Sequence, residues 1–258
     1  MRRYWVLAVP LLVAVAATAG YVAFPTSGHS DEQVVHYDFS EDTVTDETVE
    51  DVSGERNHGE IVAFDDHQPE VAGGVMQFDE GSHHVVVDLE DRPLEDDFTI
   101  VVEVRNEFQE HFAGVVTSDS WRIVAPYDRY GFYTPEEGID SDDYEGEEWK
   151  HLTAVHRDGT FELYVDGEFV DELEVSDDTE AETIYVSQRP DGYWFEGEIA
   201  EVQIYDRAIS PAEVDAVYAD RPWLPSAVFT GEFRFGAAIA VAVLAIGTAG
   251  YEVRRTDG

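Results

Sequence analysis

The chain has 258 residues, 57 acidic and 15 basic, and its formal net charge of −42 would repel nucleic acids and anionic lipid head groups. Hydrophobic residues make up 43% of the chain and aromatic residues 12%, which is enough to build a folded core. Cysteine is absent, which excludes disulfides, thiol catalysis and Cys-ligated zinc or iron–sulfur sites.

The first element is an apolar segment at residues 4–24, which carries no charge and follows two arginines. Because about 20 apolar residues span a bilayer, this segment predicts a transmembrane helix or signal anchor. A cleaved signal peptide is the alternative, with Ala17 and Ala19 forming an A-x-A-like cleavage site.

The middle of the chain is rich in short strand patterns. Runs of Val, Ile, Thr and aromatic residues predict strands at residues 83–89, 97–105, 113–118, 121–126 and 149–156. Residues 157–175 contain two Asp-Gly pairs, which favour type I′ turns and predict a three-strand meander. In its middle strand Phe161, Leu163 and Val165 alternate with Thr160, Glu162 and Tyr164, which predicts one buried face.

Many short strands without long helical stretches predict an all-β fold, a two-sheet antiparallel sandwich. One short helix is expected after the last strand, because Ser210, Pro211 and Glu213 match the N-cap, N1 and N3 positions of a capping box. No internal repeat or low-complexity linker divides the region, so it is expected to form one domain.

The last element is a second apolar segment, residues 235–251, which is rich in Ala and Gly and precedes Arg254 and Arg255. It predicts another transmembrane helix. Arginine pairs near both ends place both ends in the cytoplasm by the positive-inside rule, and the middle outside. The expected organisation is an N-terminal transmembrane helix or signal anchor (1–25), an extracellular domain (26–230), and a C-terminal transmembrane helix with a short cytoplasmic tail (231–258).

The predicted external domain carries almost all of the charge, with 54 acidic and 10 basic residues, and Lys150 is the only lysine of the chain. Dispersed carboxylates with almost no lysine are expected in a protein adapted to molar salt. There the Debye length is about 3 Å, so self-repulsion is largely screened. A calcium-loaded acidic protein is the alternative.

Four segments resemble, in the same order, signatures of laminin-G-like, concanavalin A-like lectin/glucanase jelly-roll domains, here of a membrane-anchored, haloarchaeal type. They are VHYDFSED with DVSGERNHG (35–42 and 51–59), GGVMQFDEGSHHVVV (73–87), WKHLTAVHRDGTFELYVDG (149–167), and GEIAEVQIYDRAIS with the predicted helix. The resemblance covers about residues 34–219 and implies a jelly-roll sandwich. It leaves function open, because lectins, glycosidases, adhesins and structural modules share this scaffold.

Glycosidases on this scaffold carry an E-x-D-x-x-E strand, whose acids supply the nucleophile and its helper. The corresponding residues here are Glu198, Ala200 and Gln203, so a methyl group and an amide replace two of the acids. This set cannot run glycosidic chemistry. The sequence also contains no H-E-x-x-H, no G-x-S-x-G and no phosphate-binding glycine loop, so we expect no enzyme activity.

The resemblance also implies a structural calcium ion beside the first strand and the strand before the last helix. By that resemblance its oxygen ligands would come from Asp38, Asn57 and Glu201, with backbone carbonyls of the 53–59 turn. Arg56 stands where the family commonly has glycine, and it would hinder a cation or replace it by pairing with a carboxylate. A solvated acidic surface without calcium is the alternative.

Sugar binding requires aromatic rings and convergent polar groups. Two loops, residues 125–135 and 189–197, supply the candidate ligand-binding residues Tyr127, Tyr130, Tyr133, Tyr193 and Trp194. The alternative is that these rings seal the edges of the core.

These features predict a membrane-anchored cell-surface binding module for carbohydrate binding or adhesion. Its expected partners are a cell-surface glycan or an envelope protein, with the lipid bilayer contacted through the two hydrophobic segments. A structural envelope protein that engages another surface protein is the alternative, and a divergent glycoside hydrolase is a weaker one.

Overall fold

The computed structural model describes residues 32–64, 70–79, 83–106, 109–144, 148–175 and 179–219. The two predicted transmembrane segments, 4–24 and 235–251, lie outside these residues. Across the part of the chain that is described, no helix has the length and apolar character needed to cross a membrane.

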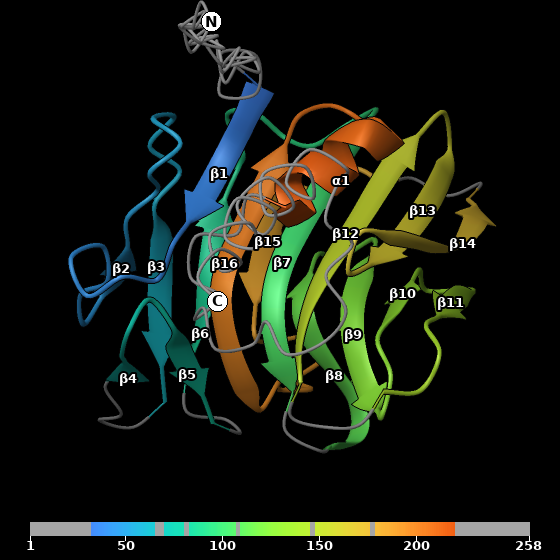
Figure 1. Ribbon diagram of the computed structural model, residues 1–258. Helices are drawn as coiled ribbons and strands as arrows, with labels where there is room; N and C mark the ends of the chain where they lie inside the picture. Colours follow the sequence, from blue (N-terminus) through green and yellow to red (C-terminus); the bar gives the residue numbers. More distant parts are fainter. Residues whose placement is uncertain are drawn as a thin grey trace, which may run out of the picture.

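The described residues form two eight-stranded antiparallel sheets that lie face to face (Figure 1). Sheet A has the order β14 (Glu168–Glu174), β13 (Thr160–Val165), β12 (Trp149–Arg157), β7 (Phe98–Asn106), β16 (Gly197–Tyr205), β5 (Met76–Phe78) and β4 (Glu70–Val71), with β1 (Gln33–Tyr37) also paired to β16. Sheet B has the order β11 (Gly138–Asp140), β10 (Gly131–Tyr133), β9 (Arg122–Tyr127), β8 (Gln109–Thr117), β15 (Thr183–Val186), β6 (His83–Asp88), β3 (Gly59–Ala63) and β2 (Thr48–Val49). With the short helix α1 (Pro211–Ala219), this confirms the predicted all-β sandwich.

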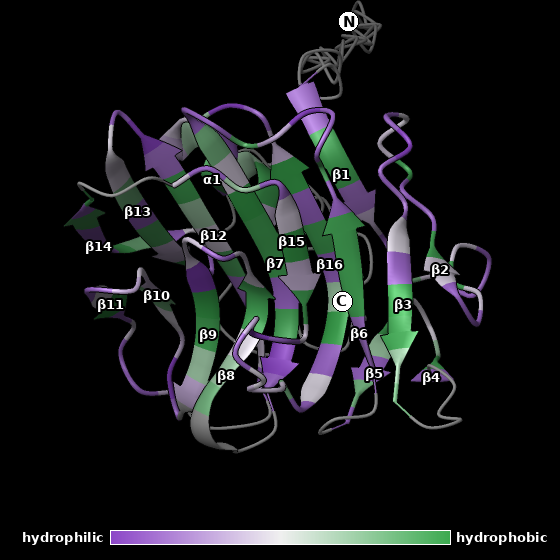
Figure 2. Ribbon diagram, turned by 180° about the vertical axis from the view of Figure 1, so that it is seen from behind, coloured by the Kyte–Doolittle hydropathy of each residue, from purple (hydrophilic) through white to green (hydrophobic). Residues whose placement is uncertain are grey.

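The hydrophobic core lies between the two sheets. Rings from opposite sheets meet there, since Phe132 of β10 stacks on Phe161 of β13 with ring centroids 4.0 Å apart. Trp121, which is fully buried, packs against Phe98 and Phe132. Seen from behind, the long central strands are largely hydrophobic and the connecting loops are hydrophilic (Figure 2). The strand patterns therefore bury their apolar residues as the sequence predicts.

The predicted meander is confirmed, because β12, β13 and β14 are neighbours in sheet A. Both of its Asp-Gly turns have two residues at positive φ: Asp158 at 49° and Gly159 at 77°, and Asp166 at 53° and Gly167 at 79°. Two successive positive φ angles define the type I′ turn, whose twist matches that of the flanking strands.

The prediction of a single buried face on β13 is incomplete, since Tyr164 on its other face is only 5% exposed. Helix α1 lies across the outer face of sheet A and buries that side (Figure 1). Its contacts form a second, smaller core cluster of Val101, Val155, Tyr164, Tyr205, Ile209 and Val214. The cluster occupies the end of β7 that holds Val101, and it does not include Arg105 at the other end.

The N-terminus of α1 is capped by Glu213, as the sequence predicts. The Glu213 carboxylate accepts hydrogen bonds from the Ser210 backbone N–H at 2.7 Å and the Ser210 hydroxyl at 2.8 Å. Arg207 pairs with the same carboxylate at 2.9 Å. Burial alone would raise the pKa of Glu213, but the hydrogen bonds from Arg207 and Ser210 outweigh it and hold the pKa at about 2. The helix is thus fixed in place over the sheet by an ionised cap.

Candidate functional site

Two of the predicted metal ligands, Asn57 and Asp38, make hydrogen bonds to other parts of the fold. The Asn57 side-chain amide donates to the Val34 carbonyl at 2.7 Å, and its backbone N–H donates to Asp51 at 3.0 Å. Asp38 accepts hydrogen bonds from the Thr43 hydroxyl at 2.6 Å and the Ser40 backbone N–H at 3.2 Å. Burial would raise the pKa of Asp38, but these hydrogen bonds outweigh it and lower the pKa. Both side chains therefore make structural hydrogen bonds within the fold.

The third predicted ligand, Glu201, is 8% exposed and belongs to a different network. Its Oε1 atom accepts hydrogen bonds from His36 Nε2 at 2.8 Å and Gln203 Nε2 at 2.7 Å. Burial, followed by the nearby Glu201 charge, raises the pKa of Tyr205 in this network to about 12. His36 lies opposite Gln203 in the β1–β16 pairing, which explains the contact that sequence reasoning missed.

Among the residues that the structure describes, no group of three or more His, Asp or Glu side chains is placed to hold a metal ion. The calcium site stays a prediction from the family resemblance. Asp38, Asn57 and Glu201 each take part in hydrogen bonds within the fold.

The predicted ligand-binding tyrosines of the 125–135 segment lie in different environments. Tyr130 is fully buried, with its ring stacked on Tyr144 at a centroid distance of 4.8 Å. Tyr133 donates a hydrogen bond from its hydroxyl to Asp140 at 2.6 Å. Tyr127 ends β9, and its side chain lies outside the described part of the structure. The segment therefore offers no common ring surface from Tyr130 and Tyr133.

The other two predicted aromatic residues follow β15. Tyr193 is 44% exposed, and the Arg189 guanidinium lies 4.5 Å from its ring centroid. Trp194 packs edge-on against Phe64 at 4.8 Å and against His84 at 5.5 Å. We call Phe64, Tyr193 and Trp194 the sheet B aromatic surface, which lies beside the buried ring of His84.

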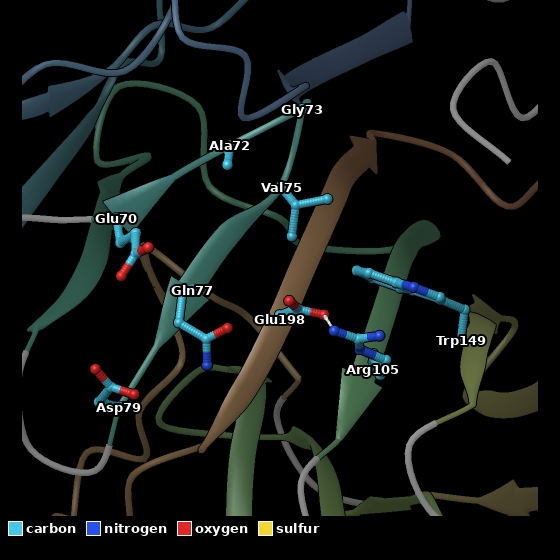
Figure 3. Close-up of a pocket in the computed structure, with 9 residues that line it drawn as sticks. All are labelled: Glu70, Ala72, Gly73, Val75, Gln77, Asp79, Arg105, Trp149 and Glu198. Atoms are coloured by element: carbon cyan, nitrogen blue, oxygen red, sulfur yellow. Dashed lines mark ion pairs between the residues drawn. The ribbon is translucent and has the colours of Figure 1, made fainter. Parts of the chain in front are cut away.

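A groove of about 670 Å³ lies on the outer face of sheet A (Figure 3). Its volume falls within the range of sites for small ligands. The lining residues come from β4, β5, β7, β12, β16, the β4–β5 turn and the position after β5: Glu70, Ala72, Gly73, Val75, Gln77, Asp79, Arg105, Trp149 and Glu198.

Strand register places five of these side chains in one row. Glu70 pairs with Gln77, Gln77 with Glu198, Glu198 with Arg105, and Arg105 with Trp149. Paired residues of antiparallel strands project on the same face, and neighbouring strands lie about 4.8 Å apart. The row therefore crosses five strands over about 19 Å, with a carboxylate at one end and an indole at the other (Figure 3).

Arg105 lies between Glu198 and Trp149 in the row. Its guanidinium forms an ion pair with the Glu198 carboxylate and lies 5.4 Å from the centroid of the Trp149 ring. The Glu198 side chain is 20% exposed and the Arg105 side chain 40%, so both remain accessible from the groove. A guanidinium over an indole ring is attracted by the ring quadrupole, which fixes the orientation of both groups.

A β-bulge shapes the same strand. The register of β16 against β7 shifts between Ile199 and Glu201, so Glu198 and Glu201 both lie on the outer face although they are three residues apart. Simple alternation predicts opposite faces for them. Glu201 is nevertheless held by His36 and Gln203 and does not line the groove.

The arrangement suits binding by stacking and hydrogen bonding. Trp149 offers an aromatic ring, Gln77 offers both a donor and an acceptor, and the carboxylates of Glu70, Asp79 and Glu198 offer acceptors. Sequence reasoning missed this site, because its members are joined by register between strands that are distant in the chain.

Comparison with known proteins identifies the scaffold. Residues 79–215, 137 of the 258 residues, match the laminin-G-like family of the concanavalin A-like lectin/glucanase superfamily. No curated protein gives a significant sequence match to the chain.

Three solved structures illustrate the similarity of fold. Botulinum neurotoxin type C, which enters cells through interaction with two ganglioside molecules, has a TM-score of 0.56 at 15% identity, over 74% of this chain and 51% of the toxin chain. The binding domain of botulinum neurotoxin DC, in complex with rat synaptotagmin II, has a TM-score of 0.57 at 14% identity, over 74% of this chain and 52% of the toxin chain. Trypanosoma rangeli sialidase has a TM-score of 0.60 at 12% identity, over 73% of this chain and 32% of the sialidase chain.

The chain thus spans about half the length of the toxin chains and a third of the sialidase, and at these identities the likeness shows the fold alone. The family match covers more than half of the chain and agrees with the two-sheet sandwich, its central meander and its capped helix. The chain belongs to the concanavalin A-like lectin/glucanase superfamily as a laminin-G-like domain.

Proposed function

We propose that the protein is a non-catalytic carbohydrate-binding module and that the groove on sheet A is its binding site. The observation that carries this proposal is the row Glu70–Gln77–Glu198–Arg105–Trp149. A sugar ring presents an apolar C–H face, which stacks on an indole, and a rim of hydroxyls, which donate to carboxylates and amides. A row that offers an aromatic ring for stacking and acceptors for the hydroxyls, over several strand spacings, fits an extended oligosaccharide.

The structural neighbours support a binding role of this scaffold. One neighbour interacts with gangliosides, and another was solved in complex with SialylT. These properties belong to the toxins, and they support only the general class of function for this chain. The proposal for this chain rests on the groove.

Substitution of the groove residues tests the proposal. Trp149→Ala should weaken glycan binding by about thirtyfold, because an aromatic side chain on which a ligand stacks typically contributes about 2 kcal/mol. Glu198→Gln should weaken it as well, because the variant loses the ion pair that orients Arg105. The matched controls are Phe169→Ala and Glu60→Gln, which remove an exposed ring and an exposed carboxylate outside the groove.

Binding would be measured by calorimetry with the full chain, and thermal unfolding would verify that each variant remains folded. If Trp149→Ala binds as tightly as the Phe169→Ala control, the groove is not the site.

We further propose that the module is displayed on the outer side of the cell membrane and works in concentrated salt. The support comes from the sequence: apolar segments 4–24 and 235–251, arginine pairs beside both, and the acidic composition between them. Protease added to intact cells should degrade the 26–230 region. Complete protection of that region would contradict the orientation.

A protein partner is the second candidate function, and the sheet B aromatic surface favours it. Phe64 and Tyr193 are 43% and 44% exposed, although most large apolar side chains of the described residues are buried. One structural neighbour was solved with the protein synaptotagmin II. Phe64→Ser with Tyr193→Ser would abolish binding to an envelope protein if that surface is the site, and it would leave glycan binding in the groove unchanged.

A further inference from the structure

The geometry and charge of the groove point to its ligand class: neutral or amine-bearing sugars, with carboxylated and sulfated sugars excluded. This inference rests on the proposed carbohydrate-binding function and specifies which glycans that site takes.

The charge of the lining is the first argument. Three carboxylates, Glu70, Asp79 and Glu198, line the groove together with one guanidinium, Arg105. Arg105 is already in an ion pair with Glu198. An anionic sugar therefore meets an excess of like charge inside the groove, and a cationic sugar meets complementary charge.

The hydrogen-bonding capacity of the lining gives the second argument. Carboxylates accept hydrogen bonds and donate none, so a ligand group that contacts Glu70, Asp79 or Glu198 must be a donor. Sugar hydroxyls and ammonium groups are donors, whereas an ionised carboxylate or sulfate offers only acceptors. To be bound, an anionic group would have to take Arg105 from Glu198 and leave that carboxylate, only 20% exposed, without its cation.

The order of the side chains gives the third argument. Trp149 lies at one end of the row and Glu70 at the other, with Asp79 on the same side as Glu70 (Figure 3). A ring stacked on Trp149 directs the remaining rings past Glu198 and Gln77 towards Glu70 and Asp79. The acidic end is therefore reached by any oligosaccharide that fills the groove, so the charge selection acts on each extended ligand.

The test uses oligosaccharides that share a backbone and differ in the charge of one substituent on each sugar. Several backbones would each be prepared in three forms: neutral, with primary amines, and with oxidised C6 carboxylates. Cello-oligosaccharide, chitosan oligosaccharide and cellouronate form one such set. Binding to the full chain would be measured at one fixed KCl concentration. We expect the neutral or amine form of a bound backbone to bind at least about tenfold tighter than its carboxylated form, since each unfavourable charge contact changes affinity by up to about fivefold.

The outcomes separate the inference from the proposed function. If a carboxylated form binds as tightly as its neutral form, or tighter, the charge selection is overturned and carbohydrate binding stands. If no backbone binds in any charge form, the proposed function fails, and the inference falls with it.

Charge removal in the groove gives a second readout. Glu70→Gln combined with Asp79→Asn should reduce the ratio of neutral to carboxylated affinity by about tenfold. Glu60→Gln, which removes an exposed carboxylate on β3 outside the groove, should leave the ratio unchanged. An undiminished ratio in the double variant would show that the lining carboxylates do not set the selectivity.

Discussion

Replacing Glu201 with Gln removes a buried charge that two neighbours share. Glu201 is 8% exposed and accepts hydrogen bonds from His36 at 2.8 Å and Gln203 at 2.7 Å. The amide oxygen of the variant can accept both hydrogen bonds in place of Oε1, but both donors lose a charged partner. A hydrogen bond to a charged group contributes about 1 kcal/mol more than a neutral one, so the two bonds together lose about 2 kcal/mol. In a domain of this size that loss lowers the melting temperature by about 4–8 °C.

The assay is thermal unfolding of the parent chain and Glu201→Gln at fixed molar NaCl, with calcium and with chelator. Because His36 and Gln203 are the hydrogen-bond partners of Glu201, we expect Glu201→Gln to lower the melting temperature by the same amount with calcium and with chelator. Glu60→Gln, an exposed carboxylate on β3, should change the melting temperature by less than about 2 °C. If chelator lowers the melting temperature of the parent and Glu201→Gln abolishes that response, Glu201 binds a metal as the family resemblance implies, and the hydrogen-bond account is refuted.

Three further predictions concern the helix cap, a strained turn and the acidic surface. The pKa of Glu213 is lowered from 4.5 to about 2, so its stabilisation is present above pH 4.5 and is lost as the pH falls towards 2. Glu213→Gln should therefore cost about 1 kcal/mol in urea unfolding at pH 7 and clearly less at pH 2.5, and an equal cost at both would contradict the cap. Arg56 has a φ of 71°, a conformation that costs an L-residue about 1 kcal/mol, so Arg56→Gly should raise the melting temperature, and a fall would show that no strain is relieved. With a formal charge of −42, the chain should melt at a much higher temperature in molar KCl than in dilute buffer. A flat salt response would refute the proposed adaptation to salt.

Local sequence patterns were enough to predict the architecture. The Asp-Gly pairs at 158–159 and 166–167 fix two turns, because only the residues in the turn determine its φ angles. The cap at Ser210 and Glu213 is also a contact within one helical turn. The second buried face of β13 was missed, because Tyr164 is covered by a helix that follows much later in the chain.

The groove could not be predicted in the same way. Its row depends on the register between β4, β5, β16, β7 and β12, and no local pattern sets how distant strands align. The bulge after Ile199 changes which residues share a face with Glu198, and the sequence gives no signal for it. The sequence left two roles open for Tyr130, ligand binding or sealing the edge of the core, and the structure buries its ring completely.

The most direct test of the central claim is binding of the full chain and of Trp149→Ala to an array of neutral, amine-bearing and acidic glycans in molar KCl. We expect saturable binding of the parent to at least one neutral or amine-bearing glycan, and an affinity about thirtyfold lower for Trp149→Ala. Absence of binding to every glycan, or equal binding by the parent and the variant, would contradict the proposal that the groove binds carbohydrate.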